Sequence, residues 1–537
     1  MRLHRMRALL CAATAVPTIA CGDRAGEKAS VAETGGTAVI ALASDLDMAN
    51  SLVTAERFTQ EVNRYMLFLP LIQYDSTLGY EGALARSFEM LGDTGVVFHL
   101  RRDVRWHDGV PTTAHDVAFT FERARDARTA FPNADWLIGW GPAHVVDSFT
   151  VRFALEPIQD PLAGVALFPI MPKHRLDSIA PEAMRQTAFN KNPIGNGPFR
   201  FVEYRANDRW VFEANPDFPD ELGGRPYLDR IVIRVIPDQA ARHTELETGN
   251  IHLLISSRAE DFTKLDADPR FVGLARPSRN YAFIPWNAKR PPLNDPRVRR
   301  ALTMAMDRNE IIQVLRAGRG EIAAGPIGNE SWAFDRSIAP LPFSPDSARA
   351  LLDAAGIRDT NGDGIREFPA GKAWDLELQL PSGSPFNRDM AEMIRADLAE
   401  VGVRLVPRAI DFSAMIGNLT SPERKFDGAL MGWENDIRIN LKDLFHSTAI
   451  GSPYQFASYE NPAVDSVIDA AARTIDREAA RPLYSDIQRL IRDDQPWTFL
   501  YYYSDLNTAS EQLQGVRMDV RGTFVNAGKW WLRQQPR

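Results

Sequence analysis

The stretch FHLRRDVRWHDGVPTTAHDVAFTFER, residues Phe98–Arg123, sets His107 beside Asp108 and His115 beside Asp116. Such a group could be a metal site, a catalytic site or part of the scaffold. The two histidines are eight positions apart, which matches no common metal-ligand spacing. We therefore predict that the stretch is structural, with the Asp-Gly pair forming a turn between a strand and a helix.

The helix in this stretch has a recognisable start. Thr113 can accept hydrogen bonds from first-turn amides, and Asp116 can reach back to it, which is the capping-box pattern. Val117, Phe121 and Ala124 would then lie on one helical face. Helix initiation alone thus explains the carboxylate beside the second histidine.

Strand-like and helix-like stretches alternate along the rest of the chain, which predicts a mixed α/β protein. Residues Thr37–Asp45 alternate as a strand does. Two helices are predicted from a cap followed by proline, at Asp295-Pro296 and at Asn461-Pro462. No internal repeat is visible, which argues against a solenoid.

The bulk composition excludes several classes of protein. The 537 residues are 45% hydrophobic and 25% charged, which is ordinary for globular proteins and long enough for more than one domain. A formal net charge of −8 argues against a nucleic-acid partner. The two cysteines, Cys11 and Cys21, exclude a disulfide framework and a paired-cysteine zinc site.

The N-terminus reads as an export signal. A basic start and a short apolar segment precede TIAC, Thr18–Cys21, which resembles a bacterial lipobox. This implies a lipoprotein signal peptide at residues 1–20, lipidation of Cys21 and a flexible tether at residues 21–36. The alternative is plain secretion with cleavage near Ala20. Either way, the folded part is expected outside the cytoplasm.

The opening stretch also resembles the signature of the peptide/nickel family of extracytoplasmic solute-binding proteins of ABC transporters. Further landmarks of that family follow in its order along nearly all of the mature chain. They are NPIGNGPFRFVEY (192–204), PYLDRIVIRVIPDQAARHTELETGNIHLL (226–254), PLNDPRVRRALTMAMDRNEII (292–312), FDGALMGWENDI (426–437) and YENPAVDSVI (459–468).

The resemblance implies the two-lobed, type II periplasmic-binding-protein fold of the large peptide-binding subclass, which encloses ligand by hinge closure. The expected division is lobe I at residues 37–75, 192–283 and 505–537, an extra subdomain on it at residues 76–191, and lobe II at residues 284–504.

The resemblance also points to ligand-binding residues. In peptide-binding members, an Asp three residues after a Trp pairs with the α-ammonium of the peptide, and here Trp433 and Asp436 hold those positions. A desolvated ammonium needs a carboxylate partner, and the Trp could supply an apolar wall or a cation–π face. The alternative is a core tryptophan and a loop carboxylate. The intervening Asn435 belongs to the same candidate group.

Two further candidate ligand-binding residues have weaker support from the sequence pattern. Arg438 could hold a ligand carboxylate bidentately, or it could be a solvated loop residue. One of Tyr501, Tyr502 and Tyr503 could touch ligand, because the family hinge lies nearby; we take Tyr502 as the candidate. The following loop, GSPYQFASYENP, differs from familiar peptide sites.

No metal or cofactor site is predicted. DTNGDGIRE, residues Asp359–Glu367, resembles the start of a calcium loop, but Ala370 at the twelfth position is no acid, so a turn is favoured. His446 stands alone near the candidate pocket loop, which argues against a bare nickel ion.

The sequence thus predicts a monomeric binding protein that delivers a peptide-like solute to an ABC permease, lipid-anchored to a membrane. Sugars, opines, metal chelates and haem remain alternatives as solutes, and a role as a sensor or chaperone remains open. A secreted hydrolase is the alternative from another class, although the chain has no G-x-S-x-G, H-E-x-x-H or P-loop motif.

Overall fold

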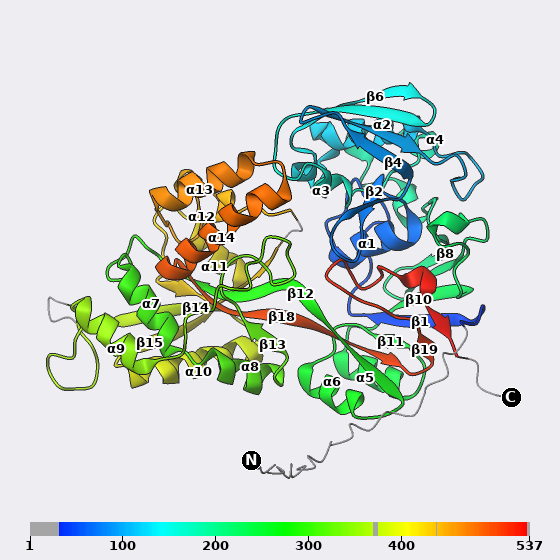
Figure 1. Cartoon of the computed structure of the whole chain (residues 1–537). Coiled ribbons are helices and arrows are strands. Elements are labelled where there is room, and N and C mark those ends of the chain that lie inside the picture. Colours follow the sequence, from blue (N-terminus) through cyan, green and yellow to red (C-terminus); the bar gives the residue numbers. More distant parts are fainter. Residues whose placement is uncertain (1–31, 369–373, 436–437, 534–537) are drawn as a thin grey trace, which may run out of the picture.

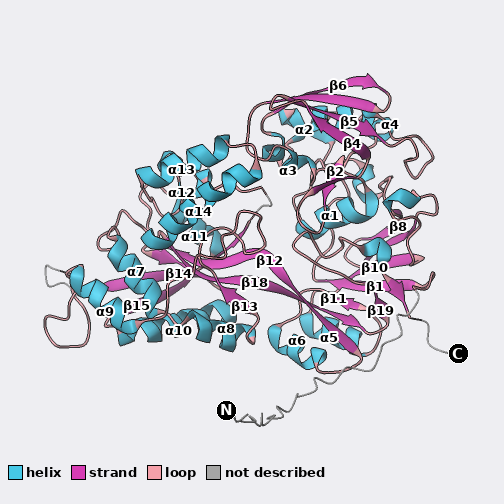
Figure 2. Ribbon diagram, in the orientation of Figure 1, coloured by secondary structure: helices cyan, strands magenta, loops and turns pink. Residues whose placement is uncertain are grey.

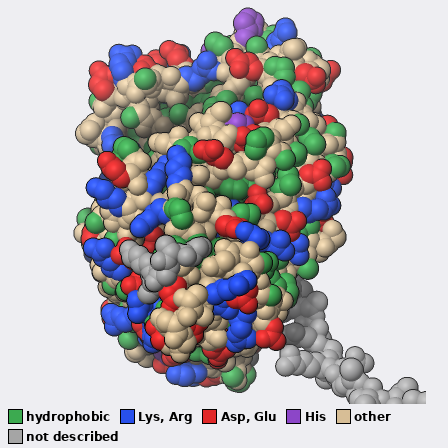
Figure 3. Space-filling view, turned by 90° about the vertical axis from the view of Figure 1, so that its left-hand side faces the viewer, with side chains coloured by type: hydrophobic (Ala, Val, Ile, Leu, Met, Phe, Trp, Pro, Cys, Tyr) green, Lys and Arg blue, Asp and Glu red, His purple; other side chains and the backbone are tan. Residues whose placement is uncertain are grey.

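The computed structural model describes residues 32–368, 374–435 and 438–533. Within those ranges, no helix is both long and apolar enough to cross a membrane. The chain forms two bodies side by side, joined through a shared sheet (Figure 1). Figure 3 shows acidic and basic side chains intermixed on one face of the molecule, with no extended patch of a single sign.

The central sheet has nine strands and runs through both bodies. Its order is β17-β12-β18-β11-β1-β10-β9-β8, and β13 pairs with β18 beside this path. The strands are β1 (Thr37–Leu42), β8 (Phe199–Arg205), β9 (Arg209–Ala214), β10 (Arg230–Val235), β11 (Leu253–Leu254), β12 (Phe271–Pro285), β13 (Gly320–Ile322), β17 (Met431–Glu434) and β18 (Trp497–Ser510).

The long strands β12 and β18 connect the two bodies. They pair antiparallel from Phe271↔Ser510 to Pro285↔Trp497, with a register shift between Pro277 and Tyr281. Figure 2 shows them crossing from one body to the other. The predicted lobe boundaries, 283/284 and 504/505, fall inside these two strands. A long two-stranded ribbon with an irregularity in its middle is a suitable place for a hinge.

The hydrophobic core is divided in the same way. One cluster takes its buried residues from Ala38 to Ile255 and from Ala509 to Trp530, and we call this body lobe I. Two other clusters lie between Tyr281 and Tyr502, in the body that we call lobe II.

A four-stranded antiparallel sheet, of order β4-β5-β7-β6, sits on lobe I. Its strands are β4 (Ala85–Met90), β5 (Gly95–Leu100), β6 (Trp140–Asp147) and β7 (Thr150–Leu155), covered by α2 (Ala114–Arg125). Phe121 of α2 packs against Phe153 of β7, with ring centroids 4.5 Å apart. This layer shares one continuous core with the rest of lobe I. The expected boundary at 75/76 lies inside a hairpin formed by β2 (Ile72–Tyr74) and β3 (Tyr80–Gly82).

The capping predictions are confirmed. Thr113 and Asp116 form a capping box at α2. The Asp295 side chain accepts from the Arg297 amide at α7 (Pro296–Ala305), and Asn461 does the same for Ala463 at α13 (Pro462–Arg473).

The other helices of nine or more residues are distributed over both lobes. They are α5 (Gln239–Glu247) in lobe I, and in lobe II α7 (Pro296–Ala305), α8 (Arg308–Arg316), α9 (Pro345–Ala354), α10 (Pro385–Glu400), α11 (Phe412–Thr420), α13 (Pro462–Arg473) and α14 (Arg477–Asp494). Lobe II also contains a three-stranded parallel sheet of order β15-β14-β16, from β14 (Asp375–Pro381), β15 (Arg404–Ile410) and β16 (Gly428–Ala429).

Candidate ligand-binding site

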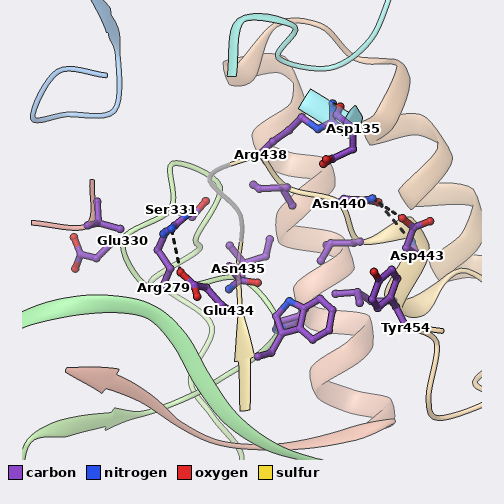
Figure 4. Close-up of a pocket in the computed structure, with 18 of the residues that line it drawn as sticks. Asp135, Arg279, Glu330, Ser331, Glu434, Asn435, Arg438, Asn440, Asp443 and Tyr454 are labelled. Atoms are coloured by element: carbon purple, nitrogen blue, oxygen red, sulfur yellow. Dashed lines mark hydrogen bonds and ion pairs between the residues drawn. The ribbon is translucent and has the colours of Figure 1, made fainter. Parts of the chain in front are cut away.

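A cavity of about 490 Å³ lies between the two lobes. Lobe I and its extra subdomain contribute Leu78, Pro132, Ala134, Asp135 and Val520. Lobe II contributes most of the remaining wall, including residues that follow β17 and the loop that carries Glu330 and Ser331 (Figure 4). A site that needs both lobes exists in full only when the lobes are together.

Trp433 combines the two roles considered for it. It lies on β17, opposite Tyr281 of β12, and its ring is 6.4 Å from that of the buried Trp497. It also lines the cavity, with Tyr454 at 5.9 Å in a T-shaped arrangement. One part of the ring therefore packs on the core of lobe II while another faces the cavity.

The next residues along β17 bring polar groups to the same wall. Arg279 and Glu434 form an ion pair at 3.1 Å, which Figure 4 shows at the edge of the cavity. The Asn435 amide donates to the Arg279 carbonyl at 3.0 Å, and its side chain lines the cavity.

Arg438 reaches across from lobe II to the extra subdomain. Its Nη1 donates to the Asp135 carbonyl oxygen at 2.9 Å (Figure 4). Both residues line the cavity. Arg438 therefore helps to hold the two sides of the cavity together in this arrangement.

A second connection between the lobes centres on Asp160, which is 5% exposed. Arg477, at the start of α14, pairs with it at 2.7 Å and donates to the Leu78 carbonyl at 2.6 Å. The Tyr80 hydroxyl donates to the same carboxylate at 2.5 Å. Burial raises the pKa of Tyr80 well above its usual value, so this hydroxyl keeps its proton. We call these residues, Tyr80, Asp160 and Arg477, the interlobe latch.

Tyr502 is placed differently from the expectation. It is 2% exposed and belongs to the core of lobe II, and it is not among the described residues that line the cavity. Its hydroxyl donates to the Ile327 carbonyl at 2.7 Å. Because Ile327 lines the cavity, Tyr502 supports the wall from behind. Tyr501 and Tyr503 are also absent from the described lining.

Other expected residues lie outside the described residues. These are Asp436, the amine anchor implied by the resemblance, and Cys21 with the signal peptide. Ala370 lies outside them as well.

The histidines of the opening stretch are held by the scaffold. Gly195 donates its amide to His107 Nδ1 at 3.2 Å, and Nε2 lies 3.0 Å from the Gly197 carbonyl. Burial lowers the pKa of His107 to about 4, so the ring is neutral. His115 is exposed on the first turn of α2, and its amide donates to the Thr113 hydroxyl at 3.3 Å. The two rings therefore have separate surroundings.

The loop Asp359–Glu367, which was predicted to form a turn, contains a turn. Asp359 accepts from the Gly362 and Gly364 amides at 2.6 and 2.9 Å. The loop also folds Glu367 back, so that one oxygen each of Asp359, Asp363 and Glu367 lies within 4.8 Å of the others. The turn explains the spacing of the loop glycines.

Sequence reasoning missed part of the cavity. Tyr454 lies in the loop GSPYQFASYENP, but only its position beside Trp433 shows that it lines the cavity. Trp332 and Asp135 carry no local signal, because the chain fold alone brings them to the cavity.

Comparison with known families decides the identity of the fold. The family model for bacterial extracellular solute-binding proteins, family 5, matches residues 79–446, which is more than half of the chain. The chain belongs to this family. Among curated proteins, this family 5 protein is 29% identical to the oligopeptide-binding protein AppA of Bacillus subtilis, over 95% of this chain and 94% of that one. It is 27% identical to heme-binding protein A of Haemophilus influenzae, over 78% of each.

Solved structures agree with this assignment. The family 5 chain matches AppA from B. subtilis in complex with a nonapeptide with a TM-score of 0.75 and 28% identity, covering 94% of this chain and 100% of that one. It matches the substrate-binding protein CtaP of Listeria monocytogenes with a TM-score of 0.81 and 25% identity, covering 94% and 100%. The expected family and the expected type II periplasmic-binding-protein fold are thus confirmed.

Proposed function

We propose that this family 5 protein captures a peptide-like solute between its lobes and delivers it to the permease of an ABC importer. The observation that carries the proposal is the cavity of about 490 Å³ whose wall comes from both lobes and combines aromatic rings with charged groups. Such a lining suits a ligand with an apolar side chain and a polar backbone. The 29% identity to an oligopeptide-binding protein over 95% of the chain supports the same class of ligand.

Closure is proposed to occur by bending of the β12–β18 ribbon, with lobe I (37–75, 192–283 and 505–537) and its subdomain (76–191) moving against lobe II (284–504). The interlobe latch and the Arg438–Asp135 bond exist only when the lobes meet. A ligand that touches both lobes adds contacts to the closed form alone and shifts the population towards it. The closed shape is then what a permease recognises.

Asp436 is proposed as the partner of the ligand's ammonium group. The proposal rests on its position three residues after Trp433, which lines the cavity. Trp433 and Asn435 would form the neighbouring wall, and Arg438 would close it from lobe II.

An oligosaccharide is the second candidate, because Trp332, Trp433 and Tyr454 line the cavity and sugars stack on aromatic rings. Haem or a metal chelate is less favoured. Among the described residues that line this cavity, none is His, Cys or Met, and Tyr454, the one tyrosine among them, packs its ring against Trp433.

Thermal unfolding with defined ligands tests the proposal. Peptides with a free N-terminus should raise the melting temperature of the native protein, and N-acetylated versions should not. Asp436→Ala should abolish the effect, while Asp486→Ala, at an exposed carboxylate on α14, should not. Peptides recovered afterwards should be intact, since the protein is proposed to have no catalytic activity. Equal stabilisation by free and acetylated peptides would exclude the amine anchor, and cleavage would exclude the binding-protein role.

The protein is further proposed to act outside the cytoplasm as a monomer, held to a membrane by a lipid on Cys21. Replacement Cys21→Ser should release it from the membrane fraction without changing ligand binding.

A further inference from the structure

A second, smaller compartment adjoins the cavity. It has a volume of about 270 Å³ and shares Arg279, Glu434 and Asn435 with the larger one. Its lining contains four arginines and two glutamates, namely Arg57, Arg64, Arg279, Arg521, Glu61 and Glu434. Arginine side chains therefore dominate one end of the interlobe space.

Three of these arginines have carboxylate partners in the described structure. Arg57 pairs with Asp505 at 2.5 Å. Arg279 pairs with Glu434 at 3.1 Å, and Arg521 pairs with Asp519 at 2.6 Å. These pairs are part of the scaffold and do not by themselves indicate a ligand.

Arg64 differs from the other three. It is 8% exposed, and its Nε donates to the Leu167 carbonyl at 3.2 Å, which fixes the side chain. Among the described residues, no carboxylate forms an ion pair with it. Glu61, the other glutamate on this wall, already accepts from the Thr523 amide at 2.6 Å and lies 3.5 Å from Arg57.

A buried guanidinium without a counter-charge is unfavourable. Arginine stays protonated at any ordinary pH, and removing its charge from water costs several kcal/mol unless an anion or hydrogen bonds replace the water. The side chain also begins in an unusual backbone segment: α1 (Arg57–Val62) continues as a single π-helical turn, η1 (Asn63–Leu67). Such turns are frequent at functional sites.

We propose that Arg64 binds a carboxylate of the captured solute in the smaller compartment. The planar guanidinium can pair with both carboxylate oxygens, and Arg57 and Arg521 line the same space. This inference rests on the proposed function. It adds that the solute has an anionic end, held by lobe I, opposite the aromatic wall of lobe II. The carboxylate is either the C-terminus of a peptide or an acidic side chain.

Calorimetric titration distinguishes these sources. Each peptide is measured as the free acid and as the C-terminal amide, with and without a glutamate. If the peptides bind at least tenfold more tightly as free acids than as amides, the bound carboxylate is the C-terminus. If the amides bind only when the peptide contains glutamate, the bound carboxylate is the glutamate side chain. Arg64→Met should weaken the peptides that carry the assigned carboxylate at least tenfold, and it should leave an amidated peptide without glutamate unchanged.

Two variants control for structural effects. Arg64→Lys should recover part of the preference, because it keeps the charge without the planar fork. Arg101→Met removes an arginine of lobe I whose side chain is 10% exposed but lies outside the cavity, and it should leave the preference intact. If Arg64→Met weakens an amidated peptide without glutamate as much as the peptides that carry a carboxylate, the role of Arg64 is structural and the inference is overturned.

Failure of the proposed function gives a different result: the native protein would then bind neither the acid nor the amide form of any peptide. In that case citrate, a simple carboxylate probe, still tests the compartment. Citrate should raise the melting temperature of the native protein but not that of Arg64→Met, and an identical response of both would refute the anion site.

Discussion

The two compartments of the interlobe space differ in chemistry and in origin. The larger one is lined by aromatic rings, including Trp433 and Tyr454, and most of its wall comes from lobe II. The smaller one is lined by arginines that come mainly from α1, η1 and the C-terminal segment of lobe I. Aromatic rings pack against apolar groups of many shapes, whereas a buried guanidinium selects an anionic group such as a carboxylate. The difference suggests that lobe I fixes the orientation of the solute and lobe II provides most of its contact area.

The largest effect is expected from the aromatic wall. Trp433→Ala should weaken solute binding about 30-fold, which is about 2 kcal/mol, because a large ring that a bound solute covers carries much of the contact energy. Calorimetric titration measures the change. Phe412→Ala, which removes an aromatic ring that is 55% exposed on lobe II, is the matched control and should have no effect. An unchanged affinity in Trp433→Ala would mean that the solute does not use this wall.

The second largest effect on solute affinity is expected from variants of the interlobe latch. Arg477→Met and Asp160→Asn should each weaken binding about tenfold, mainly through faster release, because the closed form loses a buried ion pair. The double variant should be little worse than either single one, with a coupling of about 1 kcal/mol. Additive losses would show that the two residues act separately and that the latch is not a unit.

One buried group in each lobe should respond to acid in the opposite direction from the other. In lobe I, burial lowers the pKa of His107 to about 4 from 6.5, so the unfolded chain takes up the proton first and stability falls between these values as pH drops. In lobe II, burial raises the pKa of Asp397 to about 6 from 3.8, so the folded chain takes up the proton first and gains stability as pH drops.

Urea unfolding at pH 7 and pH 5 checks this difference. His107→Gln should reduce the acid sensitivity of lobe I. Asp397→Asn should stabilise lobe II at pH 7 by on the order of 1 kcal/mol, and by less at pH 5. The same response of both variants at both pH values would contradict the assignment.

The smallest effect on binding is expected at Tyr502. Tyr502→Phe removes a buried hydroxyl that donates to the Ile327 carbonyl, so stability should fall by about 1 kcal/mol. Affinity should change less than twofold, because the ring lies behind the wall. A large loss of affinity with unchanged stability would place Tyr502 in contact with solute after all.

Much of the fold could be predicted because its signals are local. The caps at Thr113, Asp295 and Asn461 each depend on residues within three positions, and all three appear in the structure. The order of the family landmarks predicted the family and its fold, which the family model confirms. The lobe boundaries stay a prediction, and the one at 283/284 falls inside β12.

The site could be predicted only in part. Trp433 was predicted through the resemblance, Asn435 through its place beside Trp433 and Arg438 through the chemistry of its side chain, and all three line the cavity. Arg64 and the interlobe latch were missed because their partners are distant in sequence: Arg64 donates to Leu167, and Arg477 pairs with Asp160. An arginine that lacks a carboxylate partner in space has no distinguishing pattern along the chain.

Native mass spectrometry of the protein purified without denaturation identifies the solute that the interlobe cavity holds. We expect a bound species with the mass of a small peptide, bearing a free amine and a carboxylate, and retained poorly by Arg64→Met. A bound species that lacks these groups, such as a neutral oligosaccharide, would contradict it.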